Sequence, residues 1–151
     1  MFIRKLTTVD AFVAVDLGDV AGHGVARCAP KVLQGGAKDL TRTTTYSLAV
    51  LGRQETGVSA GINATPEDRD AAVAAFAAEV ASWDAGYRFV AAKGVDACSL
   101  GAIEAASEEA LLAAGAVAAA RAACPDATTA VVDGSAGPAL AAELSTYGIE
   151  V

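Results

Sequence analysis

The stretch from Leu40 to Pro66, LTRTTTYSLAVLGRQETGVSAGINATP, is the feature that most constrains what this chain can fold into. It combines a segment of helical periodicity, a glycine-containing turn, a run of small and β-branched residues, and a threonine–proline pair that favours a helix start. A helix, a buried strand and a second helix in succession are typical of α/β proteins. We therefore predict an α/β fold: a mixed sheet with helices on both faces.

The first predicted helix covers residues 38–51. Its apolar residues recur at helical spacing and form one stripe: Leu40, Tyr46, Leu48 and Leu51. The Gly35–Gly36 pair is expected to end the preceding segment before this helix begins.

The predicted strand at 58–63 is flanked by Gly57 and Gly61, where the backbone can lie close to a ligand or to a neighbouring element. Thr65 is then expected to cap a second helix whose first residue is Pro66. This helix is predicted to run to about Trp83, with one apolar face.

Further strands are predicted at 11–17, 23–28 and 87–92, where β-branched, aromatic and other apolar residues are concentrated. Residues 97–106 are expected to form a loop and a partial helix. Residues 1–106 would then form one α/β domain, and residues 107–151 a crossover helix followed by a strand at 128–132, a helix at 138–147 and the start of another strand at 149–151. That order is a fragmentary Rossmann-like βαβ unit.

Charge and cysteine usage limit the function classes. The net charge of −7 opposes binding to nucleic acid and to anionic membranes, because both carry phosphates. Cys28, Cys98 and Cys124 are widely spaced and odd in number, which is typical of a reducing compartment. Residues 1–5 are not followed by the apolar run of a signal peptide. These features predict a cytoplasmic protein.

Two motifs carry a family resemblance. LTRTTTYSLA followed by TGVSAGI resembles LARGMTYKNA and GGGKGGI of the glutamate/leucine/phenylalanine/valine dehydrogenases, in their N-terminal substrate-binding and dimerisation domain. The segments DAFVAVDLGDVAGHGVARCAP and GYRFVAAKGV are similar to that family's GGVR segment and its GRYITAEDVG strand. The likeness covers most of residues 9–137 in matching order. It implies the same domain fold.

The catalytic positions of that family fall on other residue types here. The lysine of MTYK falls on Ser47, the lysine of GGGK on Ser59 and the aspartate of AEDVG on Lys93, whereas the arginine of GGVR is kept as Arg27. A lysine is needed to polarise the substrate's carbonyl or imine, and a carboxylate to carry protons. The resemblance therefore implies a fold kept without its chemistry. Arg27, Ser47, Ser59 and Lys93 are the candidates for a ligand cleft, and we expect no catalytic residue.

In the related family the Rossmann unit binds NAD(P). Here Gly134, Ala136 and Gly137 would be the contact residues, but Ala136 takes the place of the central glycine of GxGxxG. The sequence also ends before the acidic residue that would hold the ribose. We expect no cofactor.

Several polar residues have an ordinary structural interpretation beside a chemical one. His23 with Cys28 would supply half a metal site, but a histidine in the core or a loop is favoured. Ser47 and Ser59 are potential nucleophiles, although neither lies in a GxSxG elbow, and packing is favoured. Lys93 would suit a Schiff base if it were buried; a surface position is favoured.

The acids of the first strand and its turn, Asp10, Asp16 and Asp19, are interpreted as solvated loop residues.

Three functions follow from these observations. The first is a catalytically degenerate dehydrogenase-like module that forms homo-oligomers or pairs with a partner subunit. The second is a component of an NAD(P)-dependent amino-acid dehydrogenase. The third is a binder of an amino or keto acid that keeps the cleft without its reactive groups.

Overall fold

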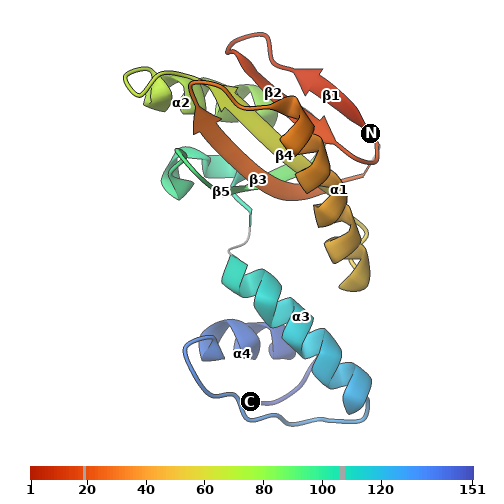
Figure 1. Cartoon of the computed structure of the whole chain (residues 1–151). Helices are drawn as coiled ribbons and strands as arrows, with labels where there is room; N and C mark the ends of the chain where they lie inside the picture. Colours follow the sequence, from red (N-terminus) through yellow and green to blue (C-terminus); the bar gives the residue numbers. More distant parts are fainter. Residues whose placement is uncertain (19, 106–107) are drawn as a thin grey trace. The chain divides into compact units, whose positions relative to one another are not determined.

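A five-stranded mixed sheet forms the centre of residues 1–105 (Figure 1). Its strands lie in the order β1 (Phe2–Lys5), β2 (Ala11–Val15), β4 (Thr56–Asn63), β3 (Gly22–Ala29) and β5 (Tyr87–Ala91). β2 pairs antiparallel with both β1 and β4, whereas β3 is parallel to both β4 and β5. The predicted α/β fold is confirmed. The structure, a computed structural model, describes residues 1–18, 20–105 and 108–151.

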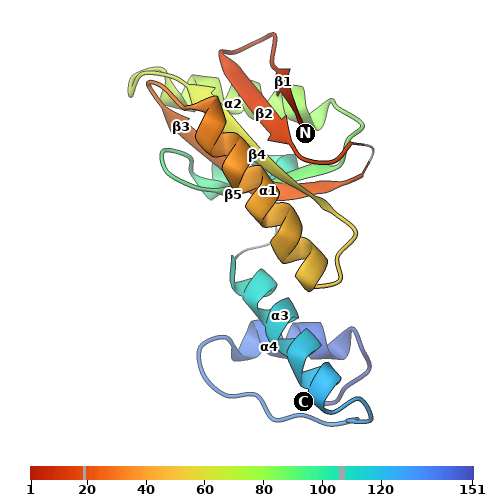
Figure 2. The ribbon, with the colours of Figure 1, turned by 45° about the vertical axis from the view of Figure 1, so that its right-hand side comes forward.

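Helices cover both faces of this sheet, because the buried strands are apolar on both sides. Along β2, Val13 and Val15 face the main core, and the alternate residues Phe12 and Ala14 face the other side. α2 (Arg69–Ala81) packs on the main core and α1 (Gln34–Val50) on the opposite face, as Figure 2 shows.

The amphipathic face predicted for the second helix is confirmed. Val73, Phe76 and Val80 of α2 are buried, and the Phe76 and Phe89 rings meet edge to face with centroids 5.6 Å apart. The predicted start was wrong, because α2 begins at Arg69. The Thr65 hydroxyl donates to Asp68 Oδ2 at 2.9 Å instead of capping a backbone N–H, and residues 66–68 form a turn.

The predicted apolar stripe of the first helix was wrong for Leu40 and Tyr46 and is confirmed at Leu48. The buried residues of α1 are Ala37, Thr41, Thr45 and Leu48, whereas Leu40 and Tyr46 are exposed. Gly35 and Gly36 do not break the chain either, since they form the first turn of α1. Tertiary packing, rather than apolar periodicity alone, therefore sets the buried face of α1.

Close backbone approach explains why threonines rather than leucines are buried. A Cβ on Gly57 of β4 would overlap the Thr41 carbonyl oxygen and lie 2.8 Å from Thr45 N. Gly57 N also donates to Thr45 Oγ1 at 2.9 Å. A Cβ on Gly61 would lie 2.5 Å from the Phe12 ring. The predicted close approach at both glycines is confirmed, with a neighbouring element as the partner.

β1 was not predicted. It pairs with β2 along the register Phe2–Val15 to Lys5–Phe12, so the strand at 11–15 is not an edge strand. Arg4 of β1 also lies over the Trp83 ring, with its guanidinium carbon 3.8 Å from the centroid. Two 3₁₀ turns, η1 (Ala97–Ser99) and η2 (Gly101–Ile103), match the partial helix expected after β5.

Among the described residues, 108–151 form a second unit with the helices α3 (Glu108–Ala123) and α4 (Gly137–Ser145). The strand predicted at 128–132 is reduced to one parallel bridge between Thr129 and Glu150. The boundary predicted between residues 106 and 107 lies outside the described residues. Within the described parts of the chain, no helix has the length and apolarity needed to cross a membrane.

Candidate functional site

A pocket of about 320 Å³, the Arg27 pocket, lies at the carboxyl end of β3. Its basic residues come from three segments: Arg27 from β3, Lys31 from the loop after β3, and Lys93 from the turn after β5. β3 and β5 are parallel, and ligands of open α/β sheets bind at the carboxyl ends of such strands. The topology therefore places this pocket where a ligand is expected.

Arg27 is the least satisfied of these side chains. Residues Ala26 and Cys28 face the main core, so alternation along β3 directs Arg27 to the face that α1 covers. Its Nε and Nη2 atoms are buried and have no hydrogen-bond partner among the described residues. A buried charge without a partner is costly, and an anion entering the pocket would offset that cost.

A tight turn holds Lys93 beside β3. Val95 N donates to the Ala92 carbonyl at 2.9 Å, and Gly94 has φ +77°. A Cβ on Gly94 would overlap the Cys28 carbonyl oxygen, so the turn needs glycine. Cys28 N donates to the Lys93 carbonyl at 2.9 Å, which fixes the backbone of Lys93, while its side chain is exposed.

The loop 30–33 carries Lys31 and leads into α1. Val32 N donates to Asn63 Oδ1 at 2.8 Å, which ties this loop to the end of β4. α1 then begins without a capping side chain and without an acidic residue in its first turn. A Cβ on Gly36 would meet nothing within 4 Å, so the backbone there is open. The sequence interpretation missed Lys31. Its position directly after a strand ended by Pro30 was the available signal.

The remaining pocket lining adds no negative charge. Cys28 is buried, and burial raises the pKa of its thiol against an opposing effect of Arg69, so the thiol stays neutral at pH 7. Val32 and Leu33 are apolar.

Two solved structures resemble this chain over nearly its whole length. L-tryptophan dehydrogenase from Nostoc punctiforme has 18% sequence identity and a TM-score of 0.61, covering 97% of this chain and 51% of that protein. The Leu-bound form of hetero-hexameric glutamate dehydrogenase from Thermus thermophilus has 19% identity and a TM-score of 0.51, covering 91% of this chain and 43% of that protein. The chain shares the fold of amino-acid dehydrogenases.

This likeness concerns the fold, and the chain spans about half the length of the structures it resembles. No protein-family model matches the sequence, and no curated protein matches it.

Ser47 and Ser59, the two serines predicted to stand in place of dehydrogenase lysines, differ in burial and do not line one site. Ser47 is exposed on α1, and its Oγ donates to the Thr43 carbonyl at 3.1 Å. Ser59 is fully buried in β4 between Ala14 and Val25, and its Oγ has no partner among the described residues. Neither serine lines the Arg27 pocket. Of the four cleft candidates, the structure brings together Arg27 and Lys93.

His23 and Cys28 do not form half of a metal site. They lie five residues apart on β3, so alternation directs them to opposite faces of the sheet. His23 is buried, as the favoured interpretation expected. No group of three or more histidine, cysteine, aspartate or glutamate residues is placed to hold a metal within the described parts of the chain.

The interpretation of the strand acids as solvated was wrong for Asp16. This residue is buried, and Arg42 Nε donates to its Oδ1 at 2.8 Å. A buried carboxylate needs such a partner, which the neighbouring helix α1 supplies. Asp10 is exposed. Asp19 lies outside the described residues.

The loop before α4 does not fit the pyrophosphate of NAD(P). Gly134 has φ +89°, but its N–H donates to Asp133 Oδ1 at 2.7 Å. That amide is therefore occupied by the chain's own carboxylate, whose charge repels a phosphate. Ala136 and Gly137 follow at the start of α4, and Gly137 N donates to the Gly134 carbonyl at 3.1 Å.

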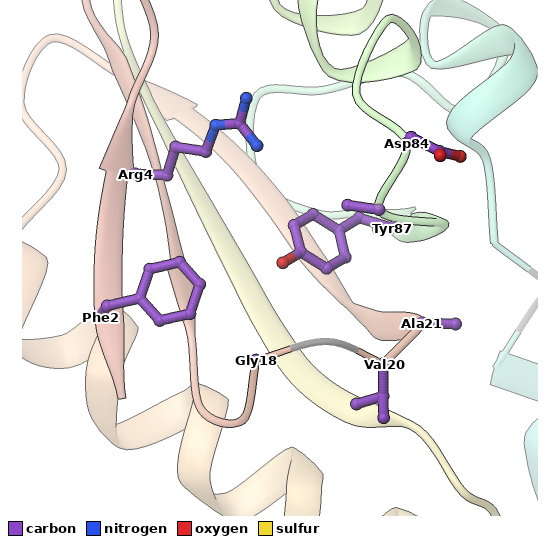
Figure 3. Close-up of a pocket in the computed structure, with 8 residues that line it drawn as sticks. Phe2, Arg4, Gly18, Val20, Ala21, Asp84 and Tyr87 are labelled. Atoms are coloured by element: carbon purple, nitrogen blue, oxygen red, sulfur yellow. The ribbon is translucent and has the colours of Figure 1, made fainter.

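A larger pocket of about 690 Å³ is lined by residues of β1 and β5, the two outer strands of the sheet, and by the loops that precede β3 and β5 (Figure 3). The rings of Phe2 and Tyr87 point toward one another across it, and the Asp84 carboxylate points away. No buried polar atom that lacks a partner, among the residues that the structure describes, belongs to its lining. The Arg27 pocket is therefore the stronger candidate.

Proposed function

We propose that this chain is a dehydrogenase-like domain that binds an amino or keto acid in the Arg27 pocket without transferring hydride. The observation that carries the proposal is the guanidinium of the partly buried Arg27, whose Nε and Nη2 atoms are buried and have no partner among the described residues. Adjacent guanidinium donors match the two oxygens of a carboxylate, and such paired hydrogen bonds are among the strongest in proteins.

The similar structures support this class of ligand. One is a tryptophan dehydrogenase and the other is a glutamate dehydrogenase in its leucine-bound form. Both names refer to amino acids, which carry a carboxylate that could accept hydrogen bonds from Arg27.

The proposal that the chain does not transfer hydride rests on three features. Ser47 and Ser59 carry no charge and lie apart, Lys93 has the sign opposite to a proton-accepting carboxylate, and the loop 133–137 does not fit a pyrophosphate. Loss of one group that stabilises transition-state charge costs about 10²–10³ in rate. Groups that act together do not contribute additively, so their joint loss leaves little beyond binding.

Calorimetric titration tests ligand binding. Glutamate, leucine, tryptophan and their keto acids are titrated into the wild-type chain, into Arg27→Gln, and into Arg88→Gln as a control. Arg88 is exposed on β5 outside the pocket lining, so the control removes the same charge elsewhere. We expect saturable heat that Arg27→Gln abolishes and Arg88→Gln retains, with circular dichroism confirming that both variants fold. No saturable heat with any of these acids contradicts the proposal.

The absorbance of reduced NAD or NADP tests the second part of the proposal, namely that the chain does not transfer hydride. The chain is incubated with each amino acid and NAD or NADP at mildly alkaline pH, and no turnover above a heat-killed control is expected. Turnover that disappears in Ser59→Ala or Lys93→Ala would refute the statement that the chemistry is lost.

A second candidate function is self-association or pairing with a partner subunit. Large apolar side chains are exposed on and just before α1: Leu33, Leu40, Tyr46 and Val50. Val50 is 86% exposed, and apolar surface of this kind is typical of protein interfaces. The similar glutamate dehydrogenase is a hetero-hexamer. The strand at 11–15 has no free edge for pairing with another chain, because β1 and β4 cover its two sides.

Light scattering tests this candidate. We expect a mass above the 15.0 kDa of one chain at micromolar concentration. Val50→Asp should lower that mass, and Val131→Asp, an equally exposed valine in the second unit, should leave it unchanged. A monomeric wild-type chain would exclude self-association.

A further inference from the structure

We infer that the Arg27 pocket selects a compact dianion that carries no ammonium group, such as a keto dicarboxylate or a phosphate. The inference rests on the proposed function and specifies the ligand class of that same site. Its evidence is the balance of charge in the lining, the size of the pocket, and the backbone at the start of α1.

The charge balance of the lining is strongly one-sided. Arg27, Lys31 and Lys93 are three cations, and the other lining residues carry no carboxylate. Like charges gathered in one pocket repel each other, and the repulsion grows as the pocket loses water. A ligand with a single negative charge would leave a net positive charge in the pocket. A dianion offsets more of it.

The side chains of the same lining include no carboxylate for an ammonium group. An α-amino acid needs a carboxylate or several carbonyl oxygens for its –NH₃⁺ group. The polar side chains that line this pocket are donors, apart from the neutral thiol of Cys28. An amino acid would therefore bring its cation toward three others, whereas the corresponding keto acid would not.

The backbone adds to this preference. α1 is a 17-residue helix whose first turn contains Gly35 and Gly36 and no acidic residue. The N-terminus of a helix carries a partial positive charge, which favours anions. Because Gly36 lines the pocket and has open space around it, an anionic group can approach the backbone there.

The volume limits the ligand's size. About 320 Å³ is near the lower end of the range of roughly 300–1,000 Å³ that small-molecule sites span. This space suits a compact acid and excludes a dinucleotide. Two sources of compact dianions remain, dicarboxylates and phosphate, and the experiment distinguishes them.

Calorimetry on the full chain, in a buffer without phosphate, compares four probes. 2-Oxoglutarate and glutamate have the same carbon skeleton and differ in the ammonium group, 4-methyl-2-oxovalerate is a keto acid with one charge, and inorganic phosphate is the second source. We expect 2-oxoglutarate to bind about tenfold more tightly than glutamate and 4-methyl-2-oxovalerate, because each charged hydrogen bond gained contributes about that factor.

Variants locate the selectivity. Lys31 and Lys93 are exposed, so Lys31→Gln and Lys93→Gln should fold normally. Each should weaken 2-oxoglutarate several-fold and change the affinity for 4-methyl-2-oxovalerate less than twofold, while Arg88→Gln changes neither. Phosphate that competes with 2-oxoglutarate at equal affinity supports the dianion class with phosphate as a second source, and weak phosphate binding supports dicarboxylates.

Two results overturn the inference and remain distinguishable. If glutamate or 4-methyl-2-oxovalerate binds as tightly as 2-oxoglutarate and Arg27→Gln still abolishes binding, the proposed function stands and the dianion selectivity is wrong. If none of the four probes binds, both are wrong.

Discussion

Glycine and alanine are abundant in both units of this protein, and the two units pack them differently. In the first unit, Gly57 and Gly61 lie so close to their neighbours that a Cβ would meet other atoms at 2.8 Å or less. In the second unit, a Cβ on Gly134, Gly137 or Gly148 would meet nothing within 4 Å. Gly57 and Gly61 of the sheet are therefore packing requirements. The three glycines of the second unit serve turns and helix ends.

The cores differ in the same direction. The first unit buries apolar residues on both faces of its sheet, including the fully buried rings of Phe76 and Phe89. The second unit has one small cluster, formed by Val117, Leu144 and Ile149. Apolar area buried per residue largely sets stability, so the first unit should be the more stable part of the chain.

The largest effect is expected for Gly57→Val. The new side chain would overlap the Thr41 carbonyl oxygen and force α1 away from β4. We expect the free energy of unfolding to fall by about 3 kcal/mol, at the upper end of the range for overpacked cores. Urea unfolding followed by circular dichroism measures this change.

The matched control is Gly137→Val in the second unit. Because its Cβ meets open space, the change in unfolding free energy should stay within about 0.5 kcal/mol. Equal effects of the two substitutions would show that the close approach of α1 and β4 does not set the difference between the units.

Hydrogen exchange tests the difference in stability directly. Amides of α4 should exchange about 100-fold faster than those of β2 and β4, because the second unit can open while the sheet remains folded. Mass spectrometry of peptides from the intact chain measures both regions in one experiment. Equal protection of the two regions would contradict the expected difference in stability and indicate that both units unfold as one cooperative structure.

The strands of the first unit could be predicted because a buried strand between two helix layers needs a short, continuous apolar run. The segments at 11–17 and 58–63 have that composition, and both contain strands. β1 could not be predicted in the same way. Its residues Arg4 and Lys5 are charged and exposed, and the strand forms because β2 offers an edge for pairing.

The helix errors have a physical origin as well. Sequence periodicity assigns large apolar residues to the buried face, but α1 lies too close to β4 to accommodate them. Thr41 and Thr45 are buried instead, with their hydroxyls bonded to the carbonyls of residues 37 and 41 at 2.7 and 3.2 Å. This hydrogen bonding satisfies the polar groups that the close packing buries.

The candidate site was predictable in part. Arg27 and Lys93 were identified from aligned motifs, and the fold places them at one pocket. Lys31 was missed, although its position directly after a strand ended by Pro30 was an available signal. The separation of Ser47 from Ser59 was equally invisible, since it depends on which face of α1 packs against the sheet.

The pH dependence of stability should separate the units. His23 is the single histidine of the chain and lies in the first unit; burial and, to a lesser degree, Arg53 lower its pKa against the opposing effect of Glu55. Between the folded pKa and the unfolded value of 6.5, the unfolded chain binds more protons. Stability is therefore retained above pH 6.5 and falls as the pH drops below it, by at most about 1.4 kcal/mol per pH unit.

Urea unfolding between pH 7.5 and 5.5, values chosen to span the ordinary histidine range of about 6.5, measures this slope. His23→Gln should flatten it, even if its absolute stability is lower. A slope that persists in the variant would assign the effect to other groups. Exchange in α4 should not respond to His23→Gln, because that helix belongs to the second unit.

The smallest effect is expected for Ser59→Ala. The Ser59 hydroxyl is fully buried and has no hydrogen-bond partner among the described residues, so its removal loses no bond and relieves a desolvated polar group. We expect the free energy of unfolding to rise by up to about 1 kcal/mol. Ser145→Ala in α4 is the matched change in the second unit, where an exposed hydroxyl donates to the Ala141 carbonyl at 2.8 Å. That variant should differ from the wild type by less than about 0.5 kcal/mol, as exposed positions usually do. A loss of stability in Ser59→Ala would mean that Oγ has a partner, such as a buried water or a ligand.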